Sequence, residues 1–399
     1  MLIGNHNAAR KQADATFQNT HIYVKDKGLY IFATKECAGE GYDGRISGTN
    51  KFFHSLKIEA ELCNVEGVYM SKNHGPFERL QDVLSDDMSA VNTLISTRMS
   101  SENAPRIPEV TAHLVEAGGK RLRPMLTLAA ARMCGYDGDD HVKLAATVEF
   151  IHTATLLHDD VVDESGQRRG RPTANLLWDN KSSVLVGDFL FARSFQLMIE
   201  TGSLRVLDIL ANASAVIAEG EVLQLTAAQN IETTEEIYLQ VVRGKTAALF
   251  AAACEVGGVI AGAPEDQVDA LRGYGDALGV SFQIVDDLLD YGGASSALGK
   301  NTGDDFREGK LTLPVIMAIS QGDSNERTFW ARTIGKRQQQ DGDLEHALEL
   351  MAKHRTLEAT KVRALSWANV ARKSLAPLPD SPLKTHLDEL AEFVVSRIT

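Results

Sequence analysis

Apolar residues recur at helical spacing along almost the whole chain from residue 70 onward. The periodicity is clearest in residues 76–99, 184–200 and 204–224, and further amphipathic segments follow in residues 328–399. We therefore predict an all-α fold for residues 70–399.

The first 69 residues have a different composition and only weak periodicity. They are rich in glycine, asparagine, lysine and aromatic residues. Residues 21–34 could form a short hairpin with residues 26–28 at its turn, and the remainder is typical of a linker. We interpret Met70 as the natural start and residues 1–69 as a weakly ordered extension that is dispensable for activity. A genuine accessory segment is the alternative.

Two acidic clusters of identical spacing each follow an apolar helical run. They are Asp159, Asp160 and Asp163, and Asp286, Asp287 and Asp290. Carboxylates four residues apart share a helical face and repel each other. Carboxylates from two facing helices can hold several Mg²⁺ ions, which also bind phosphate oxygens. One cluster alone could be a solvated helix end, but two of them predict a metal-bridged phosphate site.

Basic residues lie where an anionic ligand could meet these cations. Arg168 and Arg169 directly follow the first cluster, and Lys120 and Arg123 share one helical face. Basic residues that lead into a buried helix often only mark its solvated end. The two glycines before Lys120 favour a binding role, because glycine lets a backbone approach a phosphate closely.

Three further motifs lie near these clusters in the sequence or carry charge. His152 lies about two helical turns before Asp159 and can share its face, although a buried core histidine is the alternative. Lys245 and Thr246 belong to a Gly-Lys-Thr sequence that lacks both the spacing and the strand of a P-loop, which we exclude. Residues 298–314, with Lys300 among their charged residues, predict a loop that can close over a charged ligand. No HExxH or Cys-His set supports zinc.

Composition narrows the class of protein. The 399 residues carry a net charge of −13 (41 basic and 54 acidic residues), which argues against nucleic acid as the main partner. The four cysteines are scattered without a CxxC pair, which is typical of reduced thiols and a cytoplasmic setting. No uncharged apolar run reaches the roughly 20 residues needed to span a bilayer, and the N-terminus has no apolar signal core.

From Met70 onward the sequence resembles the trans-isoprenyl diphosphate synthases, in particular the long-chain class that makes quinone side chains. The resemblance rests on GGKRLRP, LLHDDVVDESGQRRGRPTAN, GKT, FQIVDDLLDY and GKNTGDDFREGKLTLP, without departure from the family pattern. It implies an isoprenoid synthase fold of roughly a dozen helices around a central cavity. It also implies a Mg²⁺ requirement of about three ions per site, with Mn²⁺ as a possible substitute, and usually a homodimer.

The same resemblance implies a role for each matched residue. Isopentenyl diphosphate would be held by Lys120, Arg123, His152 and Arg169. The allylic diphosphate, farnesyl or geranylgeranyl, would be held by Arg168, Lys245, Thr246, Gln283 and Lys300. Metal ions would be bridged by Asp159, Asp163 and Asp286, with Asp160, Asp287 and Asp290 in support.

The residues before the first cluster bear on product length. The side chains four and five positions before Asp159 are Thr155 and Ala154, both small, where short-chain members carry a bulky residue. We expect an open floor and a product of roughly forty to fifty carbons, decaprenyl above all. Helix packing alone is the other explanation for a small residue at Ala154.

Three other functions share part of this pattern. A class I terpene cyclase would not need the basic cluster of a second substrate, and a non-catalytic subunit of a heteromeric synthase would be expected to have lost acidic motifs. A shorter-chain synthase differs only at the floor. Membrane contact for product release and use of the product as a quinone tail are inferences from the resemblance.

Overall fold

The structure is a computed structural model, and the chain divides into two units, Met1–Lys72 and Asn73–Thr399. In the first unit it describes three short strands, and in the second it describes residues 75–116, 118–292 and 303–397.

The described part of the first unit is a small antiparallel sheet. Its strands are β1 (Thr20–Lys25), β2 (Gly28–Ala33) and β3 (Arg45–Ile46), in the order β1-β2-β3. Lys25 pairs with Gly28, which confirms the hairpin predicted for residues 21–34. Gly28 is the first residue of β2, and residues 26 and 27 lie outside the described part. The linker predicted for most of residues 1–69 also lies outside it.

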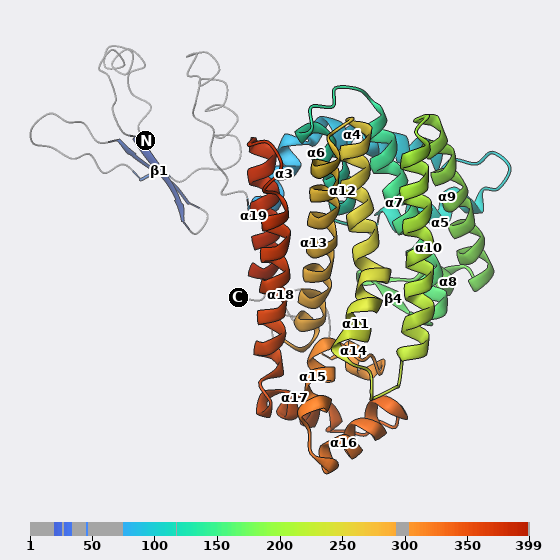
Figure 1. The fold of residues 1–399 in the computed structure, drawn as a ribbon, viewed down its shortest axis with the longest axis vertical. Coiled ribbons are helices and arrows are strands. Elements are labelled where there is room, and N and C mark those ends of the chain that lie inside the picture. Colours follow the sequence, from blue (N-terminus) through green and yellow to red (C-terminus); the bar gives the residue numbers. More distant parts are fainter. Residues whose placement is uncertain are drawn as a thin grey trace, which may run out of the picture. The chain divides into compact units, whose positions relative to one another are not determined.

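The second unit is almost entirely helical, as predicted (Figure 1). Its α-helices up to the second acidic cluster are α3 (Pro76–Val83), α4 (Ser85–Arg98), α5 (Arg106–Glu116), α6 (Leu122–Met133), α7 (Asp140–Val162), α8 (Ala174–Leu177), α9 (Asn180–Glu200), α10 (Leu204–Ala227), α11 (Glu235–Val242), α12 (Ala248–Ile260) and α13 (Glu265–Tyr291). The remaining ones are α14 (Asp304–Arg307), α15 (Leu313–Gln321), α16 (Ser324–Trp330), α17 (Asp343–Lys353), α18 (Thr356–Ser374) and α19 (Pro382–Ser396).

In the described residues of this unit, three other elements interrupt the α-helices. Two are π-helical segments, η1 (Arg243–Ala247) and η3 (Ala331–Gly335), and one is the two-stranded ribbon of β4 (Gln167–Arg168) and β5 (Arg171–Pro172). The described residues form more helical segments than the dozen expected. The reason is that several are very short, such as α8 and α14, and that π-turns divide others.

Several helix starts carry local signals that explain their positions. The side chains of Asp179, Ser203, Thr234 and Ser381 each accept a hydrogen bond from a backbone N–H in the first turn of α9, α10, α11 and α19. Asp323 forms a full capping box at α16. Such caps each contribute about 1 kcal/mol by satisfying backbone donors that have no partner within the helix.

Helices α12 and α13 lie at the centre of the unit. α13 packs against α12 and α18, α12 packs against α6 and α10, and α7 packs against α9. In Figure 1 the long helices α10, α12, α13 and α18 run in the same general direction, while α15, α16 and α17 gather at one end. The acidic ends of α7 and α13 are therefore carried on helices anchored in the core.

Three apolar clusters fill the described part of the unit. The largest involves α3, α4, α6, α7, α12, α13, α18 and α19. A second lies between α7, α9, α10 and α12, and a third lies among α15, α16 and α17. Each fully buried large apolar side chain in them stabilises the fold by about 1.5–3 kcal/mol relative to exposure.

Helix α9 has an unusual apolar surface. Its length and composition alone would suffice for a helix that crosses a membrane. Of its most apolar stretch of 18 residues, 39% is buried within the protein. Core helices of globular proteins pass the same test. Its exposed apolar residues include Leu185 and Ile199, which are 67% and 66% exposed.

Candidate active site

The first acidic cluster lies at the C-terminal end of α7. Asp159 and Asp160 belong to its last turns, and Asp163 is its C-cap. Asp160 is fully buried and accepts a hydrogen bond from Arg168 Nε at 2.8 Å. The β4–β5 ribbon follows α7 and turns the chain back, so that Arg168 of β4 lies against the end of α7. Burial raises the pKa of Asp159 to about 7, and Lys245 opposes this shift.

The second acidic cluster lies at the C-terminal end of α13. Asp287 is buried and accepts hydrogen bonds from Tyr238 Oη at 2.7 Å and Gln283 Nε2 at 2.8 Å. Burial raises its pKa to about 6, although both hydrogen bonds oppose the shift. Asp286 is more exposed and pairs with Arg397 at 3.2 Å.

Asp290 connects the second cluster to α14. It accepts the backbone N–H of Asp305 at 3.0 Å. Burial and the charges of Asp287 and Asp290 raise the pKa of Asp305 to about 8. The segment Asp304–Arg307 is a short helix, so the prediction of a loop was wrong at these residues. Lys300 lies outside the described residues.

The π-helix η1 connects the two clusters. Lys245 Nζ lies 3.8 Å from Asp159 Oδ2 and donates to Glu221 Oε2 at 2.9 Å. Thr246 donates to Gln283 Oε1 at 2.8 Å, and Gln283 in turn binds Asp287. Adjacent residues of one π-turn thus reach both acidic clusters, Lys245 directly and Thr246 through Gln283. π-turns occur frequently at functional sites, because they redirect side chains within a helix.

A basic cluster lies beside α7. Arg123 Nη1 lies 3.3 Å from His152 Nε2, and its guanidinium lies 4.3 Å above the Phe250 ring. Burial lowers the pKa of Arg123 to about 10. Burial together with Arg123 and Arg169 holds the pKa of His152 well below its usual value. The histidine is therefore neutral at pH 7 and available to hydrogen-bond a ligand.

Arg169 and Lys120 complete the set predicted to hold isopentenyl diphosphate. A Cβ on Gly119 would lie 2.8 Å from Arg169 Nη1, so the side chain of Arg169 fills the space beside this glycine. Lys120 Nζ lies 5.8 Å from the Phe393 ring of α19, and burial and Arg397 lower its pKa. The structure thus brings Arg123, His152 and Arg169 close to one another and places Lys120 toward the C-terminal helix.

The two residues predicted to limit product length differ in burial. Ala154 is fully buried in the largest apolar cluster. Thr155 is half-buried and donates to the carbonyl of His152 at 2.8 Å. One turn earlier, Ile151 belongs to the second apolar cluster, between α7, α9, α10 and α12.

The acidic residues suit divalent cations that are bound together with an anionic ligand. Among the described residues, no three His, Cys, Asp or Glu side chains converge as a ready metal site. Asp160 Oδ2 and Glu221 Oε1 are buried and have no hydrogen-bond partner in the part of the chain that the structure describes. Mg²⁺ is usually held by one or two carboxylates together with phosphate oxygens, so a diphosphate would supply the missing ligands.

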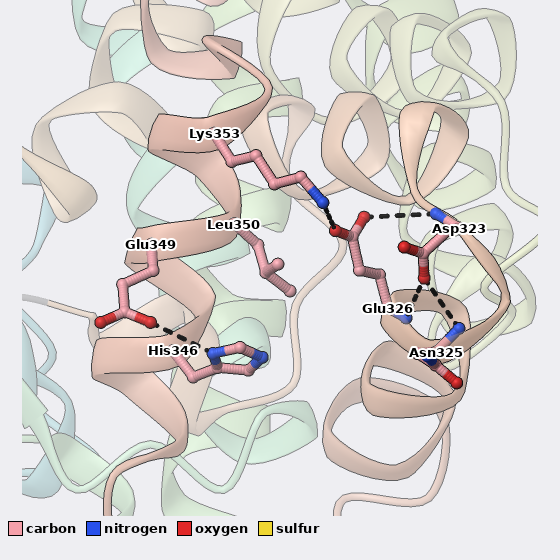
Figure 2. A pocket seen from close by; sticks show the side chains of 7 residues that line it. All are labelled: Asp323, Asn325, Glu326, His346, Glu349, Leu350 and Lys353. Atoms are coloured by element: carbon pink, nitrogen blue, oxygen red, sulfur yellow. Dashed lines mark hydrogen bonds and ion pairs between the residues drawn. The ribbon is translucent and has the colours of Figure 1, made fainter.

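A surface cavity of about 500 Å³ lies elsewhere, between α16 and α17. Figure 2 shows that its polar side chains are paired with one another: Glu326 with Lys353 and with the backbone of Asp323, and His346 with Glu349. Lys353 and His354 hold the pKa of Glu326 at about 2. Because the charged side chains that line this cavity are paired with one another, they support a structural role for it.

Three residues of the site were not predicted from the sequence. Tyr238 binds Asp287, Glu221 binds Lys245, and Arg397 binds Asp286. Tyr238 lies nearly two helical turns before the Gly-Lys-Thr sequence, which was the available signal. Nothing near Arg397 in the sequence indicates its partner.

The comparisons with known proteins agree with this geometry. The family model described as polyprenyl synthetase matches residues 104–351, more than half of the chain. The octaprenyl diphosphate synthase of Escherichia coli K12 is 45% identical over 320 residues, which cover 80% of this chain and 98% of that protein.

Two solved structures are similar over most of the chain. A decaprenyl diphosphate synthase from Rhodobacter capsulatus has 74% identity and a TM-score of 0.79, covering 81% of this chain and 99% of that one. A polyprenyl synthase from Caulobacter crescentus CB15, complexed with calcium and isoprenyl diphosphate, has 52% identity and a TM-score of 0.78, covering 82% and 99%. The chain therefore belongs to the polyprenyl synthetase family, whose members are trans-prenyltransferases that depend on divalent metal and share the isoprenoid synthase fold.

Proposed function

We propose that this enzyme is a long-chain all-trans-polyprenyl diphosphate synthase that adds isopentenyl diphosphate units head to tail onto an allylic diphosphate. The observation that carries the proposal is the π-turn η1. Lys245 lies close to Asp159 of the first acidic cluster, while Thr246 reaches the second cluster through Gln283. A diphosphate lying against this turn would meet both acidic clusters.

The two diphosphates have separate basic environments in this proposal. Lys245, Thr246, Gln283 and Arg168 would hold the allylic diphosphate, together with Lys300. Arg123, His152, Arg169 and Lys120 would hold isopentenyl diphosphate. Neutral His152 would donate a hydrogen bond while the arginines supply the charge. Two bound substrates react as an effectively unimolecular pair, and this positioning can lower the barrier by several kcal/mol.

Asp159, Asp163 and Asp286 are the proposed metal ligands. Their supporting neighbours already have protein donors: Arg168 for Asp160 and Tyr238 for Asp287. The ions would be Mg²⁺, about three per site, with Mn²⁺ as a substitute, and would neutralise the departing diphosphate. Lys245 and Arg168 of this chain would hold the departing diphosphate. The proton lost in each addition would go to that diphosphate rather than to a side chain.

The product is proposed to contain roughly forty to fifty carbons, with decaprenyl diphosphate favoured. The small side chains of Ala154 and Thr155 support an open floor, and the relatives named above make octaprenyl and decaprenyl diphosphates. A quinone side chain is the proposed use of the product.

A homodimer in the cytoplasm is proposed as the working form. The apolar side chains exposed on α8, α9 and α10 support it: Leu176, Leu177, Leu185, Phe195, Ile199, Leu204, Val222 and Leu225. Because α9 packs against both α8 and α10, these residues lie on neighbouring helices, and apolar side chains exposed together can mark an association site. The product's long apolar tail makes peripheral membrane contact during release part of the proposal.

Residues 1–69 are proposed to be dispensable. The family match begins at residue 104 and the helical unit at Asn73, which supports Met70 as the start of the catalytic part. A chain that begins at Met70 should retain the rate and product length of the full chain. A folded protein that has lost activity would show instead that the extension is an accessory segment.

The test of the function is an incubation of the purified full chain with Mg²⁺, farnesyl diphosphate and labelled isopentenyl diphosphate, with product length read by chromatography. Products of roughly forty to fifty carbons are expected. Products of about twenty carbons would keep the chemistry but reject the open floor. A folded protein without product would contradict the proposal and favour a subunit that needs a partner.

A further inference from the structure

Glu221 lies beside the first acidic cluster, and the proposed function gives it no role. Its Oε2 accepts a hydrogen bond from Lys245 Nζ at 2.9 Å, while the same ammonium lies 3.8 Å from Asp159 Oδ2. The side chains of Glu221 and Asp159 are only 20% and 16% exposed, so water screens the three charges weakly. Lys245 therefore lies between the carboxylates of Glu221 and Asp159. Its hydrogen bond goes to Glu221, which is not part of the first acidic cluster.

Backbone packing brings Glu221 and Lys245 together. Each residue directly follows a glycine, and these two glycines, Gly220 of α10 and Gly244 of η1, are in contact. A Cβ on Gly220 would lie 2.7 Å from the backbone nitrogen of Lys245, and one on Gly244 would lie 2.8 Å from the Cα of Gly220. Distances this short exclude a side chain at either position. The ion pair is therefore built into the helix contact.

The second oxygen of Glu221, Oε1, is buried without a hydrogen-bond partner among the described residues. A buried carboxylate with an unpaired oxygen is costly, and the nearby ammonium offsets part of that cost. Glu219, two residues earlier on the same helix, is exposed. The two glutamates thus have the same charge but very different surroundings.

We propose that Glu221 is a positioning residue for Lys245: it holds the ammonium on α10 and prevents it from closing on Asp159, which stays available to a divalent cation. Among the described residues, Asp159 is the other carboxylate within ion-pair distance of Lys245. Lys245 has three N–H donors, so it can stay bound to Glu221 and still donate to a diphosphate. The inference rests on the proposed function, because it takes Asp159 as a cation ligand.

A double-mutant cycle tests the inference on the full chain. The variants are Glu221→Gln, Lys245→Met and the pair, with Glu219→Gln as the charge-matched control. The measurement is calorimetric binding of Mg²⁺ in the presence of inorganic pyrophosphate, followed by the Mg²⁺ dependence of the prenyl transfer rate.

Glu221→Gln should raise the Mg²⁺ concentration for half-saturation about tenfold, as expected for coupled residues in one ion-pair network. In the Lys245→Met background the same change should have less than about a twofold effect, because no ammonium remains to compete for Asp159. Glu219→Gln should match the wild type. Glu221→Asp, which keeps the charge, should recover part of the loss and serves if the glutamine variant fails to fold.

Two results would overturn the inference. One is an equal effect of Glu221→Gln in both backgrounds, which would mean that Glu221 acts through its own charge or as a direct ligand. The other is wild-type Mg²⁺ binding by Glu221→Gln. Failure of the proposed function looks different, because the wild type would then make no polyprenyl product whatever the binding cycle shows.

Discussion

The phenol oxygen of Tyr238 lies 2.7 Å from Oδ2 of Asp287, and both side chains are buried. The tyrosine belongs to α11, immediately before the π-turn, and the aspartate to the second acidic cluster. Gln283 donates to the other oxygen of Asp287. Because protein donors take both oxygens, Asp287 anchors the end of α13 against α11, whereas its neighbour Asp286 is the proposed metal ligand.

Removing the hydroxyl in Tyr238→Phe should weaken this anchor. We expect a stability loss of about 1–2 kcal/mol, because a buried carboxylate oxygen loses its donor, and a fall in kcat/KM of roughly tenfold. The Mg²⁺ requirement should rise with it. Denaturant unfolding and initial rates over a range of Mg²⁺ concentrations measure these effects.

Tyr274→Phe is the matched control for this variant. Its buried hydroxyl donates to the carbonyl of Leu387 at 2.7 Å. It should lose comparable stability without a change in Mg²⁺ requirement. Equal Mg²⁺ curves for the two variants would show that Tyr238 only supports the fold.

Arg397 provides a second prediction. Its guanidinium lies 3.2 Å from Asp286 and 5.5 Å from the Phe282 ring, so it holds a positive charge on a proposed metal ligand. Arg397→Gln should free Asp286 and lower the Mg²⁺ concentration for half-maximal rate about two- to fivefold, the range expected for a partly exposed ion pair.

The control for this variant is Arg205→Gln, which breaks an exposed pair with Glu265. It should leave the Mg²⁺ dependence unchanged. An Arg397→Gln enzyme that needs more Mg²⁺ than the wild type would reject the idea that Arg397 competes with the cation.

Product length provides a third prediction. Thr155→Phe should shorten the product, because the bulky ring replaces a half-buried side chain on the helix of the first acidic cluster. Ala154→Phe should also shorten it, but with a stability loss of about 1–3 kcal/mol from overpacking the core. Chromatography of the products together with melting curves separates the two effects. Unchanged length in both variants would place the floor elsewhere.

The fourth prediction concerns pH and lies outside the site. Lys353 and His354 hold the pKa of Glu326 at about 2, below its ordinary value of 4.5. A lowered pKa stabilises the fold above the unfolded value and loses this effect as the pH falls toward 2. Glu326→Gln should therefore lower the melting temperature by roughly 2–5 °C at pH 7.

The difference from the wild type should shrink below about pH 4.5 and vanish near pH 2. Glu349→Gln, in an exposed pair with His346, should show little effect at any pH. A melting difference for Glu326→Gln that is independent of pH would mean that the effect comes from packing rather than from charge.

The helices and the acidic clusters were predictable because their signals are local. Periodicity within a helix, and spacings such as that between Asp159 and Asp163, depend on neighbours in the sequence. The Gly-Lys-Thr sequence was recognised, but its π-helical geometry was not, because one extra residue in a turn leaves no compositional trace.

The partners of these residues were not predictable for the opposite reason. Glu221 meets Lys245 only because two glycines pack backbone to backbone, and Arg397 meets Asp286 across 111 residues of chain. The short helix α14 was predicted as a loop because its surroundings are rich in glycine and charge. Its stability comes from contacts such as that between Asp305 and Asp290, which no local pattern encodes.

The π-turn also determines how the sequence can change. A π-turn contains one more residue than an α-turn, so it is equivalent to an insertion in a regular helix. Deleting one residue from Arg243–Ala247 would restore α-helical winding and rotate α11 by about 100° relative to α12. Tyr238 would then turn away from Asp287 while both residues stayed unchanged. Length variation in this helix is therefore a more severe event than most substitutions, because the number of residues between Tyr238 and Thr246 determines which way each side chain points.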